Sequence, residues 1–180
     1  DWSSDVCSSD LSWAQKQGLV TKNPLRGAEL PPRRDSIDCL SAEEVRALLD
    51  AAARRAEPGR WRERCLHAAV HFALHTGLRK GELLALRWRD LDLNSGRLTV
   101  ARSFDGTPKS NKPRHLHLPD AVRPILAAWR PDCPKTAEGL VFPGRRRDGS
   151  FGMVRDSSDM LGLPALLRAA GLRPIVRAWH

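Results

Sequence analysis

Apolar residues recur at helical spacing directly after Ser41. Ser41 and Glu44 have the spacing of a capping box, in which each side chain bonds the backbone amide of the other residue. The apolar positions that follow share one helix face: Val45, Leu48 and Leu49. The pattern predicts a helix that begins after Ser41 and ends before the turn signal Pro58-Gly59.

Two more helices are predicted in the middle of the chain. The first covers about residues 62–76. Its expected buried stripe consists of Leu66, Ala69, Val70, Ala73 and Leu74. Gly77 follows where a left-handed C-cap is needed. The next helix is predicted to start near Lys80, and its inward positions are Leu83, Leu84 and Leu86.

The pattern then changes from helical spacing to alternation. Residues 97–102 alternate as a strand does, after a tight turn at Asn94-Ser95-Gly96. Residues 114–118 alternate as well, with Leu116 and Leu118 on one face. These two segments predict a small antiparallel sheet with Lys109 in the loop between its strands.

The remaining pattern is again mainly helical. A helix opening at Pro119-Asp120 is expected to carry Val122, Ile125, Leu126 and Trp129. Residues 140–143 predict a short buried segment, residues 145–149 a basic loop, and residues 161–170 a helix closed by Gly171. The predicted fold class is therefore α+β, mainly helical, with a small antiparallel β-sheet.

The start of the chain divides into short segments of different character. Residues 1–10 are rich in Ser and Asp without apolar periodicity and resemble translated sequencing-adapter read-through; the alternative is a genuine acidic tail. Residues 11–19 predict the last turns of a helix before the break at Asn23-Pro24. Residues 30–38 predict a stiff basic linker, so a domain boundary is expected there. At the other end, the apolar and aromatic stretch before His180 suggests truncation.

Charge adds a candidate partner to this picture. Lys and Arg number 30 against 21 Asp and Glu, which gives a net charge of +9. Such a balance favours a polyanion, and nucleic acid is the commonest one; the alternative is a merely soluble basic surface. No apolar run is long enough for a membrane span and no signal peptide is visible. The 4 Cys form no C-x-x-C pair, and a reducing cytoplasm is the simplest setting.

Arg79 is the first candidate for chemistry. It lies between two predicted helices, where a guanidinium is presented at an element boundary. The five donors of a guanidinium suit two oxygens of one phosphate. The alternative from these residues alone is a solvated cap or a pair with Glu82, one turn away.

The segment around Arg79 carries a family resemblance. Residues 75–92 read HTGLRKGELLALRWRDLD, which resembles the stretch T-G-L-R-x-G-E-L-x-x-L-x-W-x-D of tyrosine recombinases, the phage integrase family. Residues 107–118 are similar to the family's β-hairpin, residues 13–24 to the end of its helical core-binding domain, and residues 40–49 to the first helix of its catalytic domain. The resemblance implies a core-binding tail over residues 11–29 and the N-terminal part of a catalytic domain over residues 39–180.

The resemblance also implies site roles. Arg79 would clamp the scissile phosphate and Glu82 would help hold the site together. Lys109 would protonate the leaving oxygen, with Lys112 as the weaker candidate, and His180 would open the family's H-x-x-R box. The family's nucleophile is a tyrosine, and this chain contains 0 Tyr. The residues predicted to contact DNA are Lys80, Lys112, Arg114, Arg145, Arg146 and Arg147.

The function implied is that of a DNA-binding fragment of a site-specific tyrosine recombinase, acting without cofactor or metal on double-stranded DNA in the cytoplasm, at the nucleoid. The parent enzyme would cleave and rejoin strands through a phosphotyrosine link, as a tetramer on two DNA sites. The alternative is a non-catalytic DNA-binding protein derived from the same fold. His67, His71 and His75 share a helix face, but without an accompanying acidic or Cys ligand they are better explained as helix histidines than as a metal site.

Overall fold

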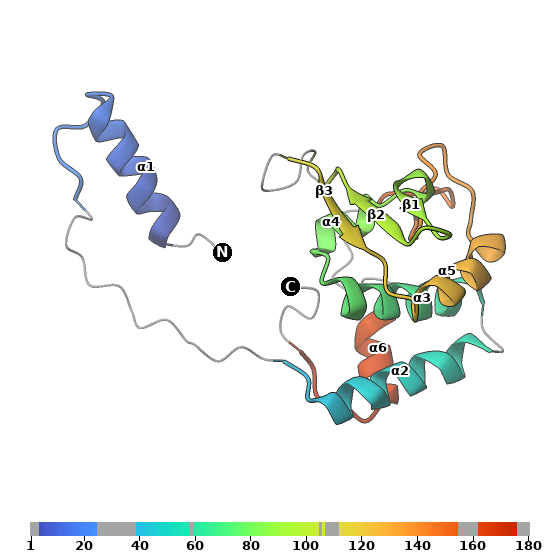
Figure 1. The fold of residues 1–180 in the computed structure, drawn as a ribbon. Helices are drawn as coiled ribbons and strands as arrows, with labels where there is room; N and C mark the ends of the chain where they lie inside the picture. The colour runs from blue at the N-terminus through green and yellow to red at the C-terminus, as the bar shows by residue number, and fades with distance from the viewer. Residues whose placement is uncertain are drawn as a thin grey trace. The chain divides into compact units, whose positions relative to one another are not determined.

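A computed structural model describes residues 4–24, 39–57, 60–104, 106, 112–154 and 162–175. The chain divides into two compact units, Asp1–Ile37 and Asp38–His180. The first unit contains helix α1, Ser4–Lys16 (Figure 1). The sequence prediction left residues 1–10 out of the fold, whereas α1 begins inside them. Ser and Asp are favoured in the first turn of a helix, and this preference gives no apolar periodicity from which the helix could have been predicted. An adapter origin for these residues stays a prediction.

The second unit holds five α-helices within the described residues. Their bounds are Ala42–Ala56 for α2, Trp61–Thr76 for α3, Lys80–Leu84 for α4, Arg123–Trp129 for α5 and Leu163–Ala169 for α6. The capping box at the start of α2 is confirmed, because the Glu44 amide donates to the Ser41 hydroxyl and the Ser41 amide to the Glu44 carboxylate. The predicted C-cap of α3 is also confirmed, with Gly77 in the left-handed region at φ 62.

The predicted sheet is present, with one short strand added. Its strands are β1, Leu91–Asp92, β2, Arg97–Val100, and β3, Arg114–His117, in the order β1-β2-β3. Both pairings are antiparallel, and Leu98 lies opposite Leu116. Helix α3 lies between this sheet and α2 in Figure 1. The fold is thus the predicted α+β arrangement, mainly helical with small antiparallel sheets.

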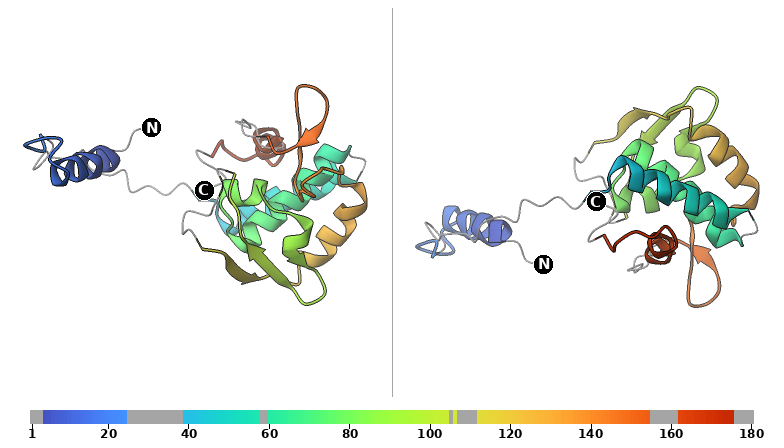
Figure 2. Two further views of the ribbon diagram at one scale, coloured as in Figure 1. Left: turned by 90° about the horizontal axis from the view of Figure 1, so that it is seen from above. Right: turned by 90° about the horizontal axis from the view of Figure 1, so that it is seen from below.

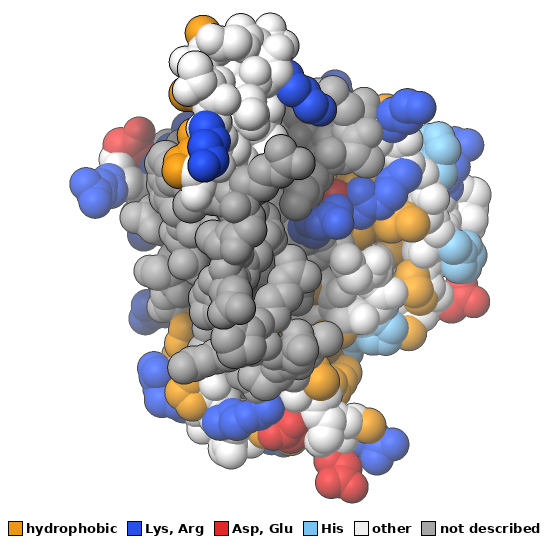
Figure 3. Space-filling model, turned by 90° about the vertical axis from the view of Figure 1, so that its left-hand side faces the viewer, with side chains coloured by type: hydrophobic (Ala, Val, Ile, Leu, Met, Phe, Trp, Pro, Cys, Tyr) orange, Lys and Arg blue, Asp and Glu red, His pale blue; other side chains and the backbone are white. Residues whose placement is uncertain are grey.

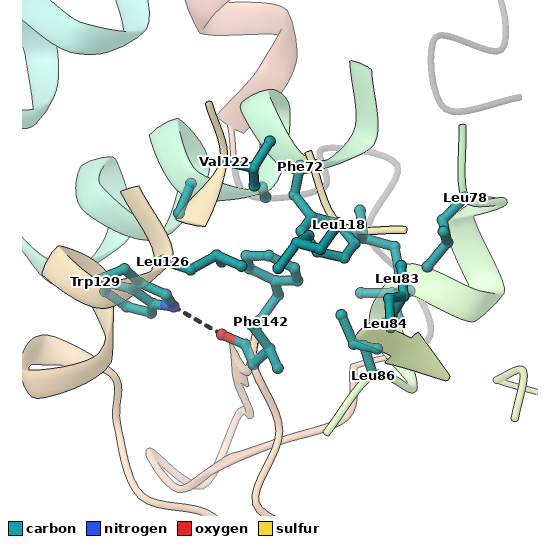
Figure 4. Close-up of a cluster of buried hydrophobic side chains, with 14 of the residues drawn as sticks. Phe72, Leu78, Leu83, Leu84, Leu86, Leu118, Val122, Leu126, Trp129 and Phe142 are labelled. Atoms are coloured by element: carbon teal, nitrogen blue, oxygen red, sulfur yellow. Dashed lines mark hydrogen bonds between the residues drawn. The ribbon is translucent and has the colours of Figure 1, made fainter. Parts of the chain in front are cut away.

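The main core lies where α3, α4, α5 and the sheet meet (Figure 4). Phe72 and Phe142 pack at a ring separation of 5.5 Å. Trp129 is buried as well, and its indole N–H donates to the carbonyl of Val141 at 2.8 Å, so its polar atom is satisfied. A second cluster joins α2, α3 and α6 through residues such as Leu48 and Leu166. The core therefore fixes α4 against both helix α3 and the three-stranded sheet.

Two local predictions differ from the structure. Leu66, Ala69 and Val70 of the stripe expected for α3 are buried, but Leu74 is 44% exposed. The buried face extends instead to Cys65, Ala68 and Phe72. The basic loop after Gly144 is the tip of a second hairpin, formed by β4, Gly144–Arg145, and β5, Phe151–Gly152. In Figure 2 this hairpin and the three-stranded sheet lie on opposite sides of the unit.

Candidate active site

Arg79 occupies the N-cap of α4. Its backbone is extended, at φ −66 and ψ 152, and the left-handed Gly77 just before it turns the chain from α3 into this position. The Arg79 amide donates to the Glu82 carboxylate at 3.0 Å, which is the backbone half of a capping box. The Arg79 side chain is 62% exposed, so the guanidinium stands at the surface above a fixed backbone.

Glu82 is buried beneath two guanidinium groups. Its side chain is 2% exposed, and both of its oxygens accept hydrogen bonds from Arg114 of β3, at 2.7 and 2.8 Å. Arg79 Nη1 lies farther away, 3.6 Å from Oε1. A two-pronged arginine–carboxylate pair is the strongest common geometry for such groups. The buried carboxylate is therefore satisfied mainly by Arg114, and the cluster of two cations and one anion keeps a net positive charge.

The same contacts control protonation in the cluster. The hydrogen bonds from the Arg114 guanidinium lower the pKa of Glu82; burial opposes this, and the Arg79 amide adds to the lowering. The hydrogen bonds to Glu82 correspondingly raise the pKa of Arg114. Glu82 is thus a carboxylate, and Arg114 a cation, throughout the physiological pH range.

Gly81 belongs to the motif around Arg79, but no role was predicted for it from the sequence. A Cβ at this position would lie 2.5 Å from the Ser103 hydroxyl and 3.4 Å from the Phe104 amide. Ser103 and Gly106 close a tight turn through paired backbone hydrogen bonds of 2.8 and 3.0 Å. The turn that precedes residues 107–111 therefore packs directly on α4, and glycine is what permits the approach.

The structure brings together some of the predicted site residues. Arg79, Glu82 and Arg114 form one cluster, and Lys80 is half-buried next to it in α4. Lys112 is exposed just before β3. Lys109 and His180 lie outside the described residues.

Three arginines of the basic loop were also predicted to contact DNA, but they do not belong to the cluster of Arg79, Glu82 and Arg114. They are Arg145, Arg146 and Arg147, exposed on the β4–β5 hairpin, away from the three-stranded sheet (Figure 2). Because α4 and β3 lie on the left-hand side of the unit in Figure 1, the view of that side shows their surroundings. Lys, Arg and His side chains, together with hydrophobic ones, are visible on the right-hand part of that view (Figure 3). DNA contact by any of these residues stays a prediction.

An exposed guanidinium above a buried, satisfied glutamate can bind an anion. Comparison with known proteins adds the family. The sequence model of the phage integrase family matches residues 38–160, well over half of the chain. The chain belongs to the phage integrase family. One relative in this family, the tyrosine recombinase XerC of Xanthomonas campestris pv. campestris (strain B100), is 34% identical over 143 residues, covering 78% of this chain and 40% of the relative.

Solved structures place the integrase-family chain in the same fold. The crystal structure of XerA recombinase matches 81% of this chain and 47% of its own, at a TM-score of 0.57 and 24% identity, which concerns the fold alone. The integrase from mycobacterium phage Brujita matches 97% of this chain and 55% of its own, at a TM-score of 0.52 and 25% identity. This chain thus spans about half, or less, of the proteins it resembles.

The three histidines of α3 form a ladder. The rings of His67 and His71 lie 4.7 Å apart, and those of His71 and His75 6.0 Å apart. Burial, with the neighbouring histidines, lowers the pKa of His71 to about 4.

Within the described ranges, no group of three or more His, Cys, Asp and Glu side chains is placed to hold a metal ion. None of the helices in those ranges has the length and hydrophobicity that a bilayer crossing requires.

Proposed function

We propose that this chain is part of the catalytic domain of a site-specific tyrosine recombinase and binds double-stranded DNA through the surface around Arg79. The supporting observation is that Arg114 fills both oxygens of Glu82, while the Arg79 side chain is 62% exposed. A fork of N–H donors on a rigid backbone suits the non-bridging oxygens of a DNA phosphate. Action on DNA would place the protein in the cytoplasm, at the nucleoid.

In the proposed reaction of the parent enzyme, a tyrosine forms a bond to the scissile phosphorus as the bond to the 5′-oxygen breaks, and a DNA 5′-hydroxyl later displaces the tyrosine. Arg79 stabilises the charge that develops on this phosphate. Losing one such preorganised donor costs roughly 3–4 kcal/mol of barrier. Lys109 donates a proton to the leaving oxygen, a contribution of about 10²–10⁴-fold, and His180 begins the H-x-x-R box. The parent enzyme acts as a tetramer on two DNA sites, and because the protein–DNA phosphodiester conserves the bond energy, the reaction needs no nucleotide or metal.

The DNA-binding part of this proposal is tested with a fluorescent duplex and the chain as it stands. We expect the logarithm of affinity to fall linearly with the logarithm of salt concentration over roughly 50 to 200 mM. Arg79→Met should weaken binding about tenfold and reduce the salt slope by about one, because one phosphate contact is lost. The matched control is Arg54→Met, the same change at an exposed arginine of α2. Salt-independent binding, or equal effects of both variants, would contradict the proposal.

A second candidate function is a non-catalytic DNA-binding protein derived from the integrase fold, since DNA binding, unlike strand cleavage in this family, needs no tyrosine; the 180 residues of this chain contain 0 Tyr. In either case the chain lacks the family's nucleophile. We therefore expect no covalent adduct when it is incubated with nicked suicide duplexes and analysed on denaturing gels. An adduct would disprove that expectation.

The two candidates differ in the gene. An open frame that completes the H-x-x-R box and later encodes a tyrosine supports the recombinase. A stop codon after His180 supports the DNA-binding protein.

A further inference from the structure

We infer that Arg114 is a positioning residue, which holds Glu82 so that the guanidinium of Arg79 stays available to a DNA phosphate. The inference rests on the proposed function and assigns Arg114 a different task from direct DNA contact. It concerns three side chains from two elements, α4 and β3, which the fold brings together.

The first argument is the competition for Glu82. Arg114 reaches both carboxylate oxygens, at 2.7 and 2.8 Å, while Arg79 Nη1 stays 3.6 Å from the nearer one. A carboxylate that accepts a two-pronged pair has most of its hydrogen-bonding capacity filled. Arg79, at the longer distance, is therefore the weaker partner of Glu82, and its side chain is 62% exposed.

The second argument is what Glu82 would do without Arg114. Its side chain is 2% exposed, and a buried carboxylate must be paired or neutralised. The charged groups that act on it in the described part of the chain are Arg114 and Arg79. With Arg114 removed, Arg79 is the remaining cation, and a small rotation would close the 3.6 Å separation. Arg79 would then neutralise Glu82 instead of binding phosphate.

This reasoning predicts a rescue. Arg114→Met should weaken duplex DNA binding about tenfold at neutral pH and lower the salt slope by about one, as Arg79→Met does. Adding Glu82→Gln removes the charge that captures Arg79. The double variant Arg114→Met/Glu82→Gln should therefore bind within about twofold of the wild-type chain, although it still lacks Arg114. If Arg114 touched a phosphate directly, the double variant would stay as weak as the single one, and the inference would be wrong.

The pH profile gives an independent readout that a purely structural role would not change. In Arg114→Met, loss of the guanidinium removes the main cause of the low Glu82 pKa. Binding by this variant should recover relative to the wild type on acidification, because protonated Glu82 releases Arg79. The double variant should show no such recovery relative to the wild type. A single variant with a flat relative profile would also overturn the inference.

Folding and binding are separated by two controls. Circular dichroism verifies that each variant is folded. If Arg114→Met does not fold, Arg114→Gln serves instead, since glutamine can donate a hydrogen bond to Glu82 but carries no charge. The same Glu82→Gln rescue is expected in that background. A wild-type chain that does not bind duplex DNA would defeat the proposed function, and this inference with it. A wild-type chain that binds, without rescue in the double variant, would defeat only the role of Arg114.

Discussion

Glu82→Ala is expected to lower the free energy of unfolding by about 3 kcal/mol. The change leaves the Arg114 guanidinium without its carboxylate, and breaking a buried pair from one side typically costs about 3–5 kcal/mol. We expect the lower end because the Arg114 side chain is 34% exposed and water partly replaces the lost contact. The Arg79 amide also loses its acceptor at the start of α4. Urea unfolding followed by circular dichroism measures the difference.

The matched control is Asp120→Ala. Asp120 also pairs with an arginine, at 2.8 Å from Arg123, but its side chain is 86% exposed. An exposed pair contributes less than about 1 kcal/mol, so this variant should unfold almost as the wild type does. Equal losses in both variants would mean that burial of Glu82 adds nothing to the strength of its pair.

The contribution of Glu82 should also depend on pH. Its pKa in the folded state is lowered from the ordinary value of 4.5, chiefly by the Arg114 hydrogen bonds. A carboxyl of this kind stabilises the fold above its unfolded pKa, and the stabilisation disappears as pH falls through the folded value. The stability difference between the wild type and Glu82→Gln should therefore be largest near neutral pH and shrink below about 4.5. A difference that grows on acidification would contradict this assignment.

Leu83→Ala is the other change with a large expected effect, about 2–5 kcal/mol of unfolding free energy. Leu83 has an exposure of 0% and lies in the main core, next to Glu82 in the sequence. Helix α4 has 5 residues, too few to be stable without packing. The cavity left by the lost side chain therefore affects the element that presents Arg79. Urea unfolding gives the stability, and the duplex assay should show weaker binding as well.

Leu74→Ala provides the same substitution without the cavity. Leu74 lies on α3 and is 44% exposed, so its removal should cost less than about 1 kcal/mol. A cost similar to that of Leu83→Ala would mean that α4 is not held by its buried face. Normal DNA affinity in a strongly destabilised but folded Leu83→Ala would mean that Arg79 does not need a fixed α4.

Much of the fold was predictable because its signals are local. The capping box of Ser41 and Glu44 and the left-handed Gly77 each depend on a few neighbouring residues, and both are confirmed. The strand alternation that predicted β2 and β3 is local too, and their pairing is confirmed. The burial of Leu74 was predicted wrongly, because periodicity selects a helix face but only the neighbouring elements decide which edge of that face is covered.

In the candidate site, too, the local features were predictable from the sequence and the long-range contacts were not. The sequence alone placed Arg79 at the start of a helix with Glu82 one turn along, and the motif around them identified the family. It did not reveal that Arg114, 32 residues from Glu82, takes both of its oxygens, or that Gly81 admits the turn at Ser103. Nor did it separate the hairpin arginines from the site. Helix caps and periodicity are determined within one or two turns of chain, so sequence decides them. Which cation reaches a buried carboxylate depends on how distant segments pack, and only the tertiary structure decides that.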